Sequence, residues 1–395
     1  MTIKAFRFSV WRFTMKKMSS LFLIIFLGHF AWGTRAFPMD AWDNENNPDN
    51  FSLHYERAFS KLPLEGELSS RPWSGDYWPT YKGGITYRWN SDFDRESERW
   101  TYPISSQIDI SRLSPAEKYD LFLGDLEFGL TRYERMRTGV MKTAPHHFLY
   151  DDSFEIPKWE GLCHAWAPAT YLYKNPSPVV MIGKLGHEIP FGSSDIKALL
   201  VYFLHLEGEN LKTKFLGSRC NLDFTKLKES VENGRLSIES FKEKINSKNC
   251  RDTNAGSFHI GLTNEVGLQK TSFIVDITRD QEVWNQPVVG YRSKILQRSK
   301  FPQKGSAPET VEEVLVKTTM AYIEEVEQTW DKEERPDSVQ EVTYYYWLEL
   351  DVEGKILGGS WKSPERPDFI WKTTRPKFTG FFKDLGKIYK KSISE

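Results

Sequence analysis

The chain has 395 residues, of which 39% are hydrophobic and 27% charged, so it can bury one large core or two smaller ones and does not have the composition of a disordered chain. Its 53 basic and 54 acidic residues nearly balance. Without residues 1–36, which carry six basic and no acidic side chains, 47 basic residues face 54 acidic ones, a net charge near −7. No polybasic tract then remains that would indicate binding to nucleic acid or to a membrane surface.

Residues 1–36 have the pattern of a secretory signal peptide. Basic residues flank an apolar run, Leu21 to Leu27, that is too short to span a membrane. Cleavage is predicted after Gly33 or Ala36, and translation could start at Met1, Met15 or Met18. We therefore expect a secreted, extracellular protein, or a periplasmic one if a Gram-negative cell retains it, with no stable membrane anchor.

Residues 37–70 are predicted to form an N-terminal arm with one helix over 52–62. An aromatic block follows over 71–81, where two prolines exclude a regular helix or a central strand, so a rigid loop is expected. Ser114-Pro115-Ala116-Glu117 has the form of a capping box with proline at the first helical position, and it predicts a helix through Leu123. Further helices are predicted over 131–141 and from residue 193 to Gly208.

Cys163 lies in the run Trp159-Glu160-Gly161-Leu162-Cys163-His164-Ala165-Trp166-Ala167-Pro168, after a glycine turn and before small apolar residues. A helix that begins here directs unpaired N–H groups and its positive dipole end at the sulfur, which favours the thiolate. We therefore predict that Cys163 is a nucleophile; a buried structural cysteine is the alternative. Trp78, Trp159 and Trp166 are candidates to line a substrate cleft, with ordinary core packing as the alternative.

The chain has three cysteines, so in an oxidising compartment two are expected to pair and one to stay free. Cys220 and Cys250 lie in polar surroundings at the two ends of a charged, helical segment. A bridge between them would close a loop of about thirty residues and stabilise the fold by roughly 3 to 4 kcal/mol in the chain-entropy model. Cys163 would then be the free thiol; pairing of Cys163 with one of the other two is the alternative.

Residues 258–264 and 272–277 are predicted to form the two strands of a hairpin. A turn centred between residues 267 and 268 makes one face of this hairpin apolar and places His259 opposite Asp276 on the other face. The carboxylate could then hold one ring nitrogen and fix the tautomer of the imidazole. A sheet histidine with satisfied hydrogen bonds and a solvated aspartate are the alternatives.

In chain order, Cys163, His259 and Asp276 match the nucleophile, base and orienting carboxylate of papain-like enzymes. Beyond residue 290, antiparallel strands are predicted over 311–326, 342–350 and 356–361, and a docked helix in the basic tail. The predicted fold class is therefore α+β. It consists of a papain-like core, in which a helix-borne Cys packs on an antiparallel sheet carrying His and Asp, with additional antiparallel strands at the C-terminus.

One segment carries a specific resemblance. Val283 to Tyr291 resembles the surface peptide by which plants recognise the secreted transglutaminase of Phytophthora, whose Trp-Asn-Gln-Pro-Val run recurs here as Trp284, Asn285, Gln286, Pro287 and Val288. Residues 161–168, 73–81 and 251–260 also resemble segments of this transglutaminase elicitor family. The resemblance covers roughly residues 70–370. Together with the composition of the two ends, the predicted organisation is a signal peptide over 1–36, an arm over 37–70, a catalytic domain over 71–371 and a basic tail over 372–395.

The resemblance implies a protein-glutamine γ-glutamyltransferase that joins glutamine and lysine side chains through a thioester on Cys163, with His259 as base and Asp276 as orienting carboxylate. Its partners would be protein substrates that supply the glutamine and the amine. The family also implies a Ca²⁺ requirement, but no run of alternating Asp and Asn places the ion, so no metal ligands are predicted. The Gly-Gln-Cys-Trp motif of animal transglutaminases is Gly161-Leu162-Cys163-His164 here, so their oxyanion and calcium residues cannot be carried over.

Two alternatives use the same residues differently. A secreted papain-like cysteine peptidase or a glutamine deamidase would have the same catalytic groups. A non-catalytic effector would instead bind a host receptor through an exposed Trp284 loop.

Overall fold

The computed structural model describes residues 42–89, 109–208, 211–245, 247, 250, 252–279, 281–327 and 337–394. The predicted signal peptide therefore lies outside the described residues. Residues 38–395 form one compact unit. Within the described ranges, no helix is long and apolar enough to cross a membrane.

The N-terminal arm is built from short turns of 3₁₀ helix, Asn44–Asn46, Pro48–Asn50 and Phe59–Lys61, followed by strand β1 (Glu65–Glu67). The predicted helix over 52–62 is wrong. The backbone N–H groups of Arg57 and Ala58 donate to the Glu56 carboxylate, and Phe59 N donates to the carbonyl of Gly354. These partners replace the i→i−4 bonds that a helix would need.

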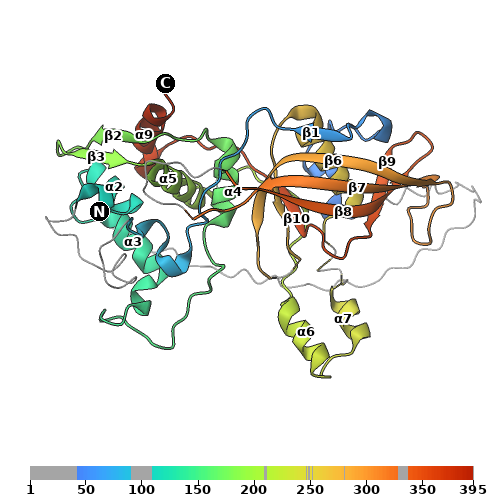
Figure 1. The fold of residues 1–395 in the computed structure, drawn as a ribbon, viewed down its shortest axis with the longest axis horizontal. Helices are drawn as coiled ribbons and strands as arrows, with labels where there is room; N and C mark the ends of the chain where they lie inside the picture. Colours follow the sequence, from blue (N-terminus) through green and yellow to red (C-terminus); the bar gives the residue numbers. More distant parts are fainter. Residues whose placement is uncertain are drawn as a thin grey trace, which may run out of the picture. The chain divides into compact units, whose positions relative to one another are not determined.

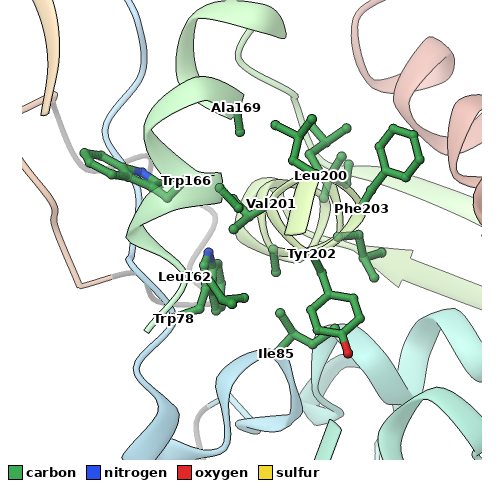
Figure 2. Packing of buried hydrophobic residues seen from close by; sticks show 14 of the residues in the cluster. Trp78, Ile85, Leu162, Trp166, Ala169, Leu200, Val201, Tyr202 and Phe203 are labelled. Atoms are coloured by element: carbon green, nitrogen blue, oxygen red, sulfur yellow. The ribbon is translucent and has the colours of Figure 1, made fainter. Parts of the chain in front are cut away.

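The helices predicted for the middle of the chain are present, with ends that differ by a few residues. Helix α2 (Pro115–Phe122) begins with the expected capping box between Ser114 and Glu117. Downstream lie α3 (Gly129–Thr138), α4 (Cys163–Leu172), the hairpin of β2 (Val179–Ile182) and β3 (Glu188–Phe191), α5 (Ser193–Leu206), α6 (Phe224–Glu232) and α7 (Ile238–Ile245). Figure 2 shows apolar side chains of α4 and α5 packed together. Trp78 of the aromatic block and Ile85 of the 3₁₀ turn Gly84–Thr86 belong to the same core.

The main sheet is antiparallel throughout (Figure 1). Its order is β4-β10-β5-β6-β7-β8-β9, with β1 on the edge of β6 beside β5. The strands are β4 (Lys214–Gly217), β5 (Ile274–Asp276), β6 (Asn285–Ser299), β7 (Glu312–Ile323), β8 (Val339–Leu350), β9 (Ile356–Trp361) and β10 (Phe369–Lys372). The last three predicted strands correspond to β7, β8 and β9 and are confirmed.

This sheet separates two hydrophobic clusters. Neighbouring residues of β5, β6 and β10 alternate between them, as side chains on a strand point to opposite faces. Ile274, Val289 and Trp371 pack with α4 and α5, whereas Val275, Val288 and Ile370 pack with the N-terminal arm and a later helix. A side chain on β5, β6 or β10 therefore faces either the α4 side or the opposite side of the sheet.

That later helix is α8 (Ala255–Leu262), which continues as a π-helix over Thr263–Gln269. The predicted strand over 258–264, and with it the hairpin that pairs His259 with Asp276, is wrong. Asn254 caps α8 by accepting from the N–H groups of Gly256 and Ser257, and every residue of the helix is buried. A helix that is apolar on all sides leaves no 3.6-residue period, so its sequence can be mistaken for a buried strand.

The chain ends in helix α9 (Leu385–Ser392), which confirms the predicted docked tail helix. Leu385, Ile388 and Tyr389 are buried in the same cluster as α4 and α5. The basic tail thus contributes to the core on which the Cys163 helix rests.

Candidate active site

Cys163 is the first residue of α4, as predicted. The turn before it is tightly held, because Leu162 N donates to the carbonyl of Tyr77 at 2.6 Å. A Cβ at Gly161 would lie 2.5 Å from the Tyr77 ring, so this position requires glycine. Cys220 and Cys250 form a disulfide bond and Cys163 is the free thiol, which confirms the predicted pairing.

The Cys163 sulfur faces the start of β6. It lies 3.4 Å from the carbonyl oxygen of Val283 and 3.7 Å from the side-chain nitrogen of Asn285. Burial raises the pKa of the Cys163 thiol to about 11; hydrogen bonds from Asn285 act against this, and the charges of Glu325 and Asp276 add to it. The expectation that the helix start favours the thiolate is therefore not met in this closed arrangement, in which the thiol donates to Val283.

Asn285 and Asp276 are paired residues of the β6 and β5 strands. Asp276 Oδ1 accepts from Thr278 N, Thr278 Oγ1 and Trp284 N at 3.0 to 3.2 Å, whereas Oδ2 is buried and has no partner among the described residues. Burial raises the pKa of this carboxyl to about 7. Asp276 is thus on the same side of the sheet as Cys163, and at neutral pH it can both give and take a proton.

A second carboxyl, Glu325, follows β7. Its Oε2 accepts from Gln286 Nε2 at 2.6 Å, and within the described part of the chain its Oε1 has no partner. Burial raises the pKa of Glu325 to about 7, and the neighbouring charge of Asp76 contributes to the rise. Burial likewise raises the pKa of Asp76 to about 7. The charges of two carboxyls, Glu325 and Asp276, therefore act on the Cys163 thiol.

His259 and Cys163 are on opposite sides of the sheet, because α8 packs on one face and α4 on the other. Its Nδ1 lies 2.8 Å from the Tyr346 hydroxyl, its ring packs against Phe59, and burial alone lowers the pKa of the imidazole to about 3. The structure does not bring His259 to Cys163 or to Asp276. In the observed fold it is a neutral core side chain.

The three tryptophans proposed for a substrate cleft fall into two groups. Trp78 and Trp166 are 2% and 0% exposed and belong to the core around α4, so the core-packing alternative holds for both. Trp159 is partly exposed. The aromatic pair near the thiol is instead Tyr77 and Trp284, whose ring centroids are 6.2 Å apart.

The segment from Trp284 to Val288 is not an exposed loop. Trp284 is partly exposed, but Asn285, Gln286, Pro287 and Val288 form the first residues of β6 and are buried between β5 and β7. The expectation of a surface loop is therefore wrong for residues 285–288, because they pair with neighbouring strands. Pro287, which has no N–H, lies opposite Ile274 of β5.

No group of three or more His, Cys, Asp or Glu side chains in the described ranges is arranged to hold a metal ion. Calcium requires several oxygen ligands in one place, usually with more than one carboxylate. No calcium site is assigned.

Sequence reasoning missed Glu325 and Trp371, and it named Asn285 only within the Phytophthora-like segment. The indole N–H of Trp371 donates to Asn285 Oδ1 at 2.8 Å, and both side chains are buried. These residues meet only because β10, β5 and β6 are neighbours in the sheet. No local pattern in the sequence indicates this order.

Comparisons with known proteins agree with this architecture. The family model described as "Transglutaminase elicitor" matches residues 45–114 and 149–391, so the chain belongs to the transglutaminase elicitor family. The fold is similar to that of the GP42 transglutaminase from Phytophthora sojae, whose crystal structure aligns with a TM-score of 0.60 and 24% sequence identity over 88% of this chain and 97% of that one. No curated protein matches the chain in a sequence search. The structural likeness shows a shared mixed fold of helices and antiparallel sheet.

Proposed function

We propose that this protein is a protein-glutamine γ-glutamyltransferase with Cys163 as its nucleophile. The observation that carries the proposal is the free thiol at the start of α4, which faces an amide donor, Asn285, and lies among carboxyls with pKa values near 7. Membership of the transglutaminase elicitor family supports the reaction class.

In the first step the thiol loses its proton and the sulfur attacks the carbonyl carbon of a glutamine γ-carboxamide. Asp276 is the proposed proton acceptor, because its free Oδ2 is on the thiol side of the sheet and its pKa of about 7 suits proton transfer at neutral pH. The C–N bond then breaks, the nitrogen takes up the proton, and ammonia leaves. A thioester on Cys163 results.

In the second step an unprotonated lysine amine attacks the thioester carbon, the C–S bond breaks and an isopeptide bond forms. The proton that the amine loses restores the Cys163 thiol. Water in place of the amine would give deamidation, so exclusion of water decides between the two products. Tyr77 and Trp284 lie beside the thiol segment and are proposed to shield it. The carbonyl of Val283 has to move away from the sulfur before substrate can reach it, since it now accepts the thiol proton.

The proposed substrates are proteins that supply glutamine and lysine side chains. The protein is proposed to act outside the cell after removal of residues 1–36. The mature chain should incorporate a fluorescent primary amine into casein, with release of ammonia and without release of peptides. Cys163→Ala should abolish incorporation and leave thermal unfolding unchanged; activity above about a thousandth of the wild-type rate would contradict the assignment of the nucleophile.

A further inference from the structure

Two buried side chains on the α4 side of the sheet, Trp371 and Asn285, connect to the sulfur of Cys163. The Trp371 indole nitrogen donates to Asn285 Oδ1 at 2.8 Å, and Asn285 Nδ2 lies 3.7 Å from Cys163 Sγ. Trp371 is 6% exposed and Asn285 is 2% exposed, so water does not compete for these bonds.

The chemistry of the indole fixes the orientation of the amide. An indole N–H can only donate, so it must meet the carbonyl oxygen of Asn285, and the amide NH₂ group then has to face the sulfur. Rotation of the amide by half a turn would place two N–H donors together and would point oxygen lone pairs at Cys163. The donor–donor contact opposes this rotation, and the oxygen lone pairs would destabilise a thiolate. The indole therefore selects the amide orientation that stabilises a thiolate.

Trp371 is itself held in place by the sheet. It is opposite Ile274 in the β10–β5 pair and opposite Phe215 in the β10–β4 pair. The Phe215 ring stacks on it with centroids 5.9 Å apart and planes inclined by 21°. The donor is therefore rigid before substrate arrives, which is the condition for preorganised stabilisation of developing charge.

We propose that Asn285 supplies an oxyanion donor of the acyl-transfer reaction and that Trp371 is the positioning residue that orients it; this rests on the proposed function. When the sulfur bonds to the glutamine carbonyl carbon, the carbonyl π electrons move to oxygen, and the negative charge passes from the sulfur to an oxygen two bonds away. The Asn285 NH₂ group, already beside the sulfur, is placed to donate to that oxygen. Collapse of the intermediate re-forms the carbonyl double bond and breaks the C–N bond. The leaving nitrogen takes the proton held by Asp276 and departs as ammonia, so the negative charge ends on the Asp276 carboxylate.

Trp371→Phe removes the indole N–H and keeps the ring. We expect the rate of Cys163 alkylation by iodoacetamide near pH 7 to fall about tenfold, which corresponds to a rise of about one unit in the thiol pKa. The kcat of glutamyl transfer should fall further, by about 10² to 10³, the cost of losing one oxyanion donor. Asn285→Ala should lower both quantities at least as much.

The double variant decides whether Trp371 acts through Asn285. If it does, Trp371→Phe should have no further effect on alkylation or on kcat in the Asn285→Ala background. Additive losses, or an unchanged pH profile of alkylation in Trp371→Phe, would overturn the proposal. Trp361→Phe is the matched control, because its indole donates to the carbonyl of Thr253 in the other cluster, and it should leave alkylation unchanged.

The two assays separate this inference from the proposed function. If the wild type transfers no glutamyl group, the proposed function and the oxyanion role both fail, while alkylation still tests the orientation of Asn285. If the wild type is active and the variants behave like it, only the present inference fails.

Discussion

The reactivity of Cys163 depends on opposing neighbours of one sulfur atom. Burial and the charges of Glu325 and Asp276 favour the thiol, and the hydrogen bonds from Asn285 favour the thiolate. Substitutions at these residues should therefore change thiol reactivity and catalysis in separable ways. That separation distinguishes a proton acceptor from a structural carboxyl.

Asp276→Asn tests the proposed proton acceptor. An asparagine oxygen can still accept from Trp284 and Thr278, so the fold should be kept. Removal of the negative charge should make iodoacetamide alkylation of Cys163 faster, whereas glutamyl transfer should slow by about 10² to 10⁴ because the base is lost. Slower alkylation together with unchanged transfer would contradict the role given to Asp276.

His259→Gln tests the corrected place of the histidine. The side chain is buried against Phe59 and bonded to Tyr346, so its replacement should cost about 1 to 3 kcal/mol of unfolding free energy. Alkylation of Cys163 and kcat per folded molecule should not change. A loss of kcat in a variant that unfolds at the wild-type temperature would restore His259 as a catalytic candidate.

At the scale of elements, the connection between β5 and β6 is the part that covers the thiol, and it is tied to the disulfide-bonded segment. Arg219 donates to the carbonyl of Gln281 at 2.5 Å, and Arg279 is bonded to Asp252 at 2.9 Å and to the carbonyl of Ile245 at 3.3 Å. Arg219 and Asp252 flank the Cys220–Cys250 bridge. We therefore expect the bridge to restrain the turn that carries Val283.

Replacement of both bridge cysteines by serine should loosen that turn. We expect the Cys220→Ser, Cys250→Ser double variant to react with iodoacetamide at Cys163 several-fold faster than the wild type. Its unfolding free energy should fall by roughly 3 to 4 kcal/mol, the chain-entropy value for a loop of this length. The control is Arg235→Ala, between α6 and α7, which should leave both quantities unchanged. Equal alkylation rates would show that the bridge does not restrain the turn.

Elements with a clear period could be predicted from the sequence, and those without one could not. The capping box of α2, the alternating strands β7 to β9 and the glycine turn before Cys163 are local signals. The fully buried α8 has no period, and its misassignment moved His259 to the wrong side of the sheet. The odd number of cysteines predicted one disulfide and the free thiol of Cys163. The contact of Asn285 with Trp371 depends on strand order and could not be inferred.

At the scale of the whole molecule, the sheet separates two hydrophobic cores, and Cys163, Asn285 and Asp276, the groups of the proposed active site, are on one side of it. Several carboxyls are buried and, among the described residues, accept no hydrogen bond from a cationic side chain. Asp76, Asp276 and Glu325 have pKa values raised to about 7, and Asp368, bonded to Cys220 N, has one raised to about 8, all chiefly by burial.

The direction of these shifts predicts how stability depends on pH. The folded protein holds these protons more tightly than the unfolded chain, whose carboxyl pKa values are near 4. Their contribution to stability is therefore complete below about pH 4 and is lost as the pH rises through 7 to 8. We expect Tm to fall between pH 5 and pH 8, and to fall less steeply in Asp276→Asn. Parallel Tm curves for the variant and the wild type would contradict this account.

Burial of residues 285–288 within β6 decides what can be detected from outside the folded protein. Their backbone groups pair with β5 and β7, and only the preceding Trp284 reaches the surface in part. An antibody raised against a synthetic peptide of this segment should therefore ignore the intact molecule and bind it after digestion or denaturation. Any receptor that binds the same epitope would therefore bind fragments or unfolded forms of this protein and not the intact fold.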